Sequence, residues 1–142
     1  VLAACLIVAA QTYEVPVNVL IGILKVEGGK VGQQVGPNRN GTYDLGPMQI
    51  NTVWVPELAQ RWQVAHGTAH RWLRDDVCVN VNVGAWILRQ QVNRAGNLRD
   101  GIARYHSATP GIGDRYASRV VNTMRRYRLL DPPRPTGAYP RA

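Results

Sequence analysis

A mainly α-helical domain with little or no sheet is the fold class that the sequence predicts. Apolar residues recur at helical spacing along several stretches, and helix-ending residues separate these stretches from one another. The 142 residues are 45% hydrophobic and 18% charged, a composition typical of a globular domain and not of a disordered chain. This length fits one domain, which we expect over residues 1–130, followed by a proline-rich tail over residues 131–142.

Two helices are expected before residue 30. Apolar residues from Leu2 onward share one helical face, and this first helix ends near Tyr13. Pro16 opens the second helix, because the first helical position needs no backbone donor. The second helix ends at Glu27, where Gly28 provides the residue that commonly follows a helix.

Two short helices are expected in the middle of the chain. Asn51 is a plausible N-cap for the first of them, which bends or restarts at Pro56. The second covers residues 68–74. We interpret His66 and His70, which show no partner pattern, as surface residues.

The stretch 76–88 carries two conflicting patterns. Its valines alternate at period two, which indicates a strand. A helical face continues through it nevertheless, formed by Val77, Val81, Ala85, Leu88 and Val92. We predict a long helix from about residue 76 to residue 94, with Asp76 as its cap and Gly96 after its end.

Two further helices complete the domain. Leu98, Ile102 and Tyr105 form the inward face of one helix, and a Thr-Pro-Gly sequence at 109–111 breaks the chain after it. The last helix has an apolar face and a basic face. Its apolar face holds Tyr116, Val120, Met124 and Tyr127, and its basic face, expected to be a solvated surface, holds Arg115, Arg119 and Arg126.

Glu27 is the residue that demands a chemical explanation. Helical spacing places it on the same face as Leu20, Ile23 and Leu24. A carboxylate buried there needs partners or a raised pKa, and a carboxyl that stays protonated near neutral pH can act as a general acid. At a frayed helix end it would instead turn into solvent, and the helix alone leaves both interpretations open.

A polar loop over residues 38–46 follows, with amides, hydroxyls and the carboxylate of Asp44. Such groups suit a sugar polymer. Asp44 lies seventeen residues after Glu27 and either takes part in the reaction or fixes the turn through its own backbone. Tryptophan can stack on sugar rings, but core packing is the expectation for the four tryptophans of the chain.

Three motifs give the chain a resemblance to the lysozyme-like superfamily, which includes goose-type lysozymes and soluble lytic transglycosylases (SLT domains). Val-Glu-Gly at 26–28 resembles the catalytic Glu-Ser step, Gly-Pro-Met-Gln-Ile-Asn at 46–51 resembles Gly-Leu-Met-Gln, and Tyr-His-Ser at 105–107 resembles the end of Ala-Tyr-Asn. The likeness runs from about residue 5 to residue 121 and is strongest to small transglycosylases of type IV and type III secretion machines. Gly28 replaces the usual Ser, and His106 replaces the usual Asn.

This resemblance implies a lysozyme-like α-helical fold with an active-site cleft, and a central helix where the valines left a choice. It implies that Glu27 is first the acid and then the base in forming a 1,6-anhydro end, with no metal or cofactor. Tyr105 would donate a hydrogen bond to Glu27 or hold the reacting sugar ring. The spacing of Glu27 and Asp44 also resembles the two carboxylates of animal-type lysozymes, a pair that would favour a retaining hydrolase.

Further side chains are expected to contact the substrate: Gln49, Met48, Asn51, Thr42, Asn40 and His106. By resemblance, Gln49 lines the cleft. Met48 is either core or cleft floor, and Asn51 is either a cleft residue or a helix cap. Thr42 and Asn40 are candidates for the N-acetyl group of the sugar.

Cys5 and Cys78 lie too far apart in sequence for metal-site spacing. The resemblance implies that they pair as a disulfide and that the protein acts in the periplasm or otherwise outside the cytoplasm. Two buried free thiols are the alternative. The apolar stretch 1–10 is too short to span a bilayer, so no transmembrane segment is expected, and we interpret the chain as a mature domain whose signal peptide is absent.

The formal net charge of +8 favours polyanionic partners such as the bacterial cell wall or nucleic acid. No nucleic-acid-binding motif accompanies it, so nucleic acid is not expected. The predicted function is a lytic transglycosylase that opens peptidoglycan for a secretion or conjugation apparatus. The alternatives are a muramidase that uses Glu27 and Asp44, and a non-catalytic module that binds cell wall or nucleic acid.

Overall fold

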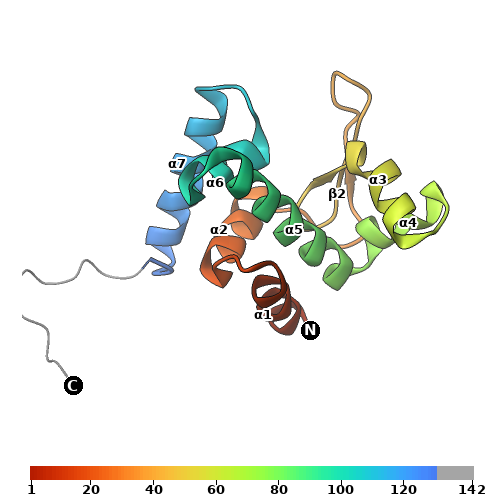
Figure 1. The fold of residues 1–142 in the computed structure, drawn as a ribbon, viewed down its shortest axis with the longest axis horizontal. Helices are drawn as coiled ribbons and strands as arrows, with labels where there is room; N and C mark the ends of the chain where they lie inside the picture. The colour runs from red at the N-terminus through yellow and green to blue at the C-terminus, as the bar shows by residue number, and fades with distance from the viewer. Residues whose placement is uncertain (131–142) are drawn as a thin grey trace, which may run out of the picture.

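The computed structural model describes residues 1–130 and confirms the mainly α-helical class (Figure 1). The expected tail at 131–142 lies outside the described residues. The helices are α1 (Leu2–Tyr13), α2 (Val17–Glu27), η1 (Thr52–Trp54), α3 (Val55–Trp62), α4 (His66–Asp75), α5 (Val77–Ala95), α6 (Leu98–His106) and α7 (Ile112–Arg126). A small antiparallel sheet has the order β1 (Gln34–Val35), β2 (Asp44–Leu45) and β3 (Ile50–Asn51).

Helix α5 runs through the centre of the molecule in Figure 1, with α6 and α7 to its left and the sheet, α3 and α4 to its right. It packs against α1, α4, α6 and β3. The helical interpretation of residues 76–88 is therefore confirmed. Asp76 caps this helix by accepting a hydrogen bond from the backbone of Val79 at 3.0 Å, and Gly96 ends it in a left-handed conformation.

Most predicted helix ends agree with the structure. Pro56 lies in the first turn of α3, directly after the short η1 turn, and α4 begins slightly earlier than expected, at His66. Two inward-facing predictions are wrong. Leu98 and Tyr127 lie at the ends of their helices, where they are 36% and 52% exposed, because a terminal residue can turn away from the core.

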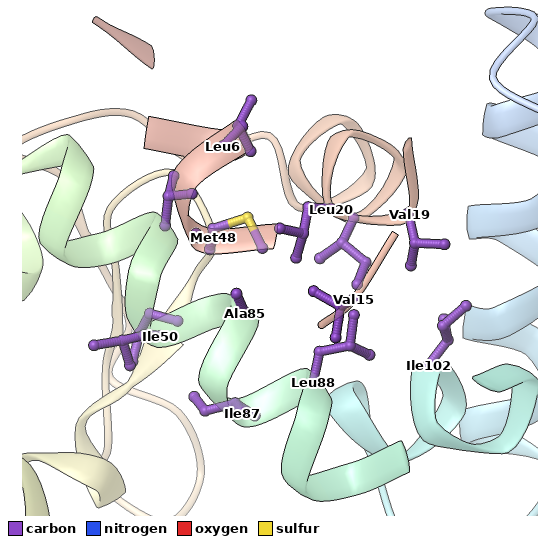
Figure 2. Packing of buried hydrophobic residues seen from close by; sticks show 14 of the residues in the cluster. Leu6, Val15, Val19, Leu20, Met48, Ile50, Ala85, Ile87, Leu88 and Ile102 are labelled. Atoms are coloured by element: carbon purple, nitrogen blue, oxygen red, sulfur yellow. The ribbon is translucent and has the colours of Figure 1, made fainter. Parts of the chain in front are cut away.

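The core gathers buried residues from α1 to α7 and from the sheet, among them Leu6 of α1, Leu20 of α2 and Ile102 of α6 (Figure 2). Leu20 and Ile23 of α2 and Leu88 of α5 have no exposed surface, and Met48 joins them from the turn between β2 and β3. The apolar face that carries Glu27 is therefore packed against the centre of the domain.

A buried amide holds that turn in place. Asn80 of α5 is fully buried, and its Nδ2 donates to the carbonyl oxygens of Leu45 at 2.8 Å and Leu73 at 2.9 Å. Its Oδ1 accepts from the backbone N–H of Met48 at 2.8 Å. Every hydrogen-bonding group of this side chain except one acceptor lone pair has a partner, so Asn80 fixes the Gly-Pro-Met-Gln turn on the central helix.

Cys5 and Cys78 form the predicted disulfide, with their Cα atoms 5.1 Å apart. It joins α1 to the start of α5, and the two helices also pack against each other. Among the described residues, no helix is both long and apolar enough to cross a membrane.

Candidate active site

A cavity of about 860 Å³ opens between the end of α2, the loop before β2, the sheet and the end of α6. Eight of the predicted site residues line it: Glu27, Asn40, Thr42, Asp44, Gln49, Asn51, Tyr105 and His106. The structure thus brings together residues that the sequence separates widely. We call this cavity the cleft.

Met48 is the predicted site residue that does not line the cleft. Its side chain is fully buried in the core, so the expected substrate contact does not come from this side chain. Gln49, the next residue, does reach the cleft. It adopts a left-handed backbone conformation, with φ of 52°, and its Nε2 donates to the carbonyl oxygen of Gly46 at 3.0 Å.

Glu27 is the last residue of α2, and its carboxyl is partly buried at the cleft wall. It does not turn into solvent as a frayed end would. Burial is the largest influence on the pKa of Glu27 and raises it from 4.5 to about 7. The negative charge of Asp44 also raises this pKa, whereas the Tyr116 hydroxyl and the positive charge of Arg119 lower it.

The backbone conformation at Gly28 explains why this chain has glycine in place of the usual Ser. It follows α2 in a left-handed conformation with φ of 64°, and its N–H donates to the carbonyl oxygen of Leu24 at 3.0 Å. A serine here would adopt a backbone conformation that L-residues with a Cβ disfavour. Glycine therefore makes an abrupt helix end directly behind the acid.

Tyr116 of α7 is the hydrogen-bond donor to Glu27, with 2.8 Å between its hydroxyl and Oε2. This hydrogen bond was one of the two roles expected of Tyr105, and for that role the prediction is wrong; the other, holding the reacting sugar ring, stays a prediction. Tyr105 lines the cleft but donates to the carbonyl oxygen of Met48 at 3.0 Å. Burial raises the pKa of both phenols above the ordinary value, so both stay protonated donors.

Asp44 lies on β2, and both of its carboxylate oxygens accept hydrogen bonds from amides. Asn38 Nδ2 lies 3.2 Å from Oδ2, and Asn51 Nδ2 lies 3.1 Å from Oδ1. Asn51 also accepts from the backbone N–H of Val53 at 2.9 Å, so it is both a cleft residue and a helix cap. Asp44 is therefore held in a fixed orientation at the cleft, beyond what a turn-forming role requires.

Thr42 connects the polar loop to the sheet. Its hydroxyl donates to Asn40 Oδ1 at 2.6 Å and accepts from Asn38 at 3.1 Å and Asn51 at 2.9 Å. The loop wall of the cleft is thus a continuous network of amides and hydroxyls. Such groups match the hydroxyl and acetamido groups of a sugar chain.

Sequence reasoning missed two further features of the site. Trp54 lines the cleft with its ring against Trp86, at 5.4 Å between ring centroids and an interplanar angle of 71°. Asn38, which orients Asp44, lay in a loop where no pattern separated it from its polar neighbours. Within the described residues, no group of three or more His, Cys, Asp or Glu side chains is arranged to hold a metal ion.

The arrangement can perform acid–base chemistry on a bound polymer. One carboxyl is partly buried and protonatable near neutral pH, and a second carboxylate lies in the same cleft. Glycosidic bond cleavage needs an acid for the leaving oxygen and negative charge near a developing oxocarbenium centre. The open, polar cleft suits a long carbohydrate better than a compact apolar ligand.

Comparison with known sequences supports this chemistry. The family model of the transglycosylase SLT domain matches residues 4–121. The invasion protein IagB of Salmonella typhimurium strain SL1344 is 28% identical over 128 residues, which cover 87% of this chain and 77% of that protein. IagB of Salmonella typhi is 28% identical over 90% of this chain and 79% of its own length. A peptidoglycan-binding-like protein of Escherichia coli O157:H7 is 27% identical over 74% of this chain and 64% of its own length.

Proposed function

The chain belongs to the transglycosylase SLT domain family, and on that premise we propose that it is a peptidoglycan lytic transglycosylase. Its substrate is the β-1,4 bond between N-acetylmuramic acid and N-acetylglucosamine. The observation that carries this proposal is Glu27, a carboxyl in the cleft whose pKa is raised to about 7. Such a group can both give and take a proton at neutral pH.

The hydrogen bond from Tyr116 supports an assignment of the acid proton. Because the Tyr116 hydroxyl donates to Oε2, Oε1 of Glu27 is left to carry the proton. Oε1–H protonates the glycosidic oxygen as the bond between that oxygen and C1 breaks. The ionised Glu27 then removes the proton from the C6 hydroxyl, whose oxygen bonds to C1 and forms the 1,6-anhydro ring. No water is consumed, and Glu27 ends protonated as it began.

In this scheme the negative charge of Asp44 stabilises the positively charged sugar centre. Asn38 and Asn51 orient the Asp44 carboxylate by hydrogen bonds. The same observation favours one alternative, a muramidase. In that reaction Asp44 attacks C1 to form a covalent glycosyl-enzyme, and water then releases the sugar with a reducing end. The two functions differ in their products and in how much they need Asp44.

Mass spectrometry of the fragments released from purified peptidoglycan tests the proposal. We expect muropeptides that end in 1,6-anhydro-muramic acid, one water lighter than hydrolysis products, and none from Glu27→Gln. Glu57→Gln, an exposed glutamate on α3, is the matched control and should release as much as the wild type. Reducing ends from the wild type, lost in Asp44→Asn, would establish the muramidase instead, and no release would leave a binding module.

We also propose that the enzyme works outside the cytoplasm, where it opens the wall locally for a secretion or conjugation apparatus. The Cys5–Cys78 disulfide supports an oxidising compartment. Two of the similar proteins are named invasion proteins, which is consistent with a specialised role. Thiol labelling of the protein in intact cells tests the location: unlabelled cysteines are expected, and labelling without prior reduction would contradict it.

A further inference from the structure

His106 lies on the ring of Tyr116. The two ring centroids are 4.6 Å apart and the ring planes differ by 7°, which is a parallel stack. His106 is the last residue of α6 and lines the cleft, whereas Tyr116 on α7 is only 3% exposed and is not part of the cleft lining. The imidazole therefore separates the buried phenol from the solvent in the cleft.

The phenol that His106 covers is the one that donates to Glu27, at 2.8 Å. A stacked ring restricts the tilt of its partner and keeps water from its face. We propose that His106 is a positioning residue: its imidazole covers Tyr116, holds the phenol hydroxyl on Glu27 and keeps water away from this pair. The effect on reaction rate rests on the proposed function, whereas the effect on the Glu27 proton does not.

The charged and titratable groups around the Glu27–Tyr116 pair lie on α6, α7 and β2. Tyr116 and Arg119 lie on α7, Tyr105 and His106 on α6, and Asp44 on β2. Burial and Arg119 lower the pKa of His106, while Asp44 opposes them. His106 is thus mostly neutral near pH 7 and acts there as an aromatic cover, without adding a positive charge beside Glu27.

The direction of the expected effect follows from the causes of the Glu27 pKa. Burial is the largest of them and raises it, and the Tyr116 hydrogen bond is a smaller, opposing influence. Removing the cover admits water to the pair, which restores hydration of the carboxylate and lowers its pKa. Asn is polar like His but has no ring, so it cannot provide the same cover.

A side-chain series tests the cover directly. His106→Phe keeps a flat ring but cannot titrate, whereas His106→Asn and His106→Ala remove the ring. The titration of Glu27 is followed by ¹³C NMR of the glutamate carboxyls, with its signal assigned through Glu27→Gln. We expect the pKa of Glu27 to fall by about one unit in the Asn and Ala variants and to stay within a few tenths in the Phe variant.

The pH profile of kcat/KM on peptidoglycan is the second readout. Its alkaline limb should move to lower pH in step with the NMR titration in the Asn and Ala variants only. His66→Ala, an exposed histidine of α4, should leave both readouts unchanged. If His106→Ala unfolds, the comparison of the Asn and Phe variants decides.

Two results would overturn the inference: a Phe variant shifted as far as the Asn variant, or no shift in either. In the first case the imidazole acts through its nitrogens and not as a cover. The NMR readout needs no substrate. If the Glu27 titration shifts in the Asn variant but not in the Phe variant, and the wild type releases no muropeptides, the role of His106 is upheld and the proposed function is rejected.

Discussion

Replacing Glu27 with glutamine should stabilise the folded protein above pH 7 and leave its stability almost unchanged near pH 4. In the folded protein the pKa of Glu27 rises from 4.5 to about 7. Each pKa unit is worth about 1.4 kcal/mol, so the ionised carboxylate costs about 3 kcal/mol of folding free energy. Below pH 4.5 the carboxyl is protonated in both folded and unfolded chains, and this cost disappears. It grows as the pH rises from 4.5 and is complete above about pH 7.

Urea unfolding of wild type and Glu27→Gln at pH 4, 6 and 8 measures this cost. Glutamine keeps the shape of the side chain and a carbonyl oxygen for the Tyr116 hydroxyl, so the charge is the main difference. Glu57→Gln, which breaks an exposed ion pair with Arg61, should change stability by less than about 1 kcal/mol at every pH. An equal stability difference between wild type and Glu27→Gln at pH 4 and pH 8 would refute the reasoning.

Three further perturbations have defined outcomes. Tyr116→Phe removes the hydroxyl that stabilises the Glu27 carboxylate, so the pKa of Glu27 should rise by about one unit, measured by ¹³C NMR; a fall would contradict this. Asn80→Ala removes the side-chain hydrogen bonds of three buried backbone groups and should cost about 2–4 kcal/mol in urea unfolding, whereas a loss under 1 kcal/mol would mean that water replaces the amide. Reducing the Cys5–Cys78 bond, whose residues are 73 apart, should lower the free energy of unfolding by up to about 4 kcal/mol, and unchanged unfolding would show that α1 and α5 dock without it.

Local pattern was sufficient for most of the fold. Helical spacing, the proline and glycine ends and the Asp76 cap predicted α1, α2 and α5 to within a few residues, since each signal acts over one or two turns. The valine-rich start of α5 was ambiguous because β-branched residues suit either structure. In the structure this segment is a helix packed against α1, α4 and α6. These contacts join distant parts of the chain, so the local sequence pattern could not predict them.

The hydrogen-bond partner of Glu27 was harder to predict than the place of Glu27 on the apolar face of α2. Tyr116 lies 89 positions after Glu27 in the chain, and periodicity identified it only as an inward residue of the last helix. An apolar face does not reveal which neighbour a phenol hydroxyl reaches. Met48 shows the converse: its motif suggested the cleft, but the turn fixed by Asn80 leaves its side chain in the core and presents Gln49 instead.

The proposed reaction asks one carboxyl to give a proton and then to take one, so neither form can be strongly disfavoured. Burial alone would favour the protonated form and make Glu27 a weaker acid, less able to give its proton to the leaving oxygen. The Tyr116 hydroxyl and the charge of Arg119 both stabilise the ionised form and oppose that effect. A pKa of about 7 is the balance of these influences, and it lies where a proton can move in either direction at neutral pH. α7, which no catalytic motif marked in the sequence, thus supplies the two groups that let Glu27 act in both steps.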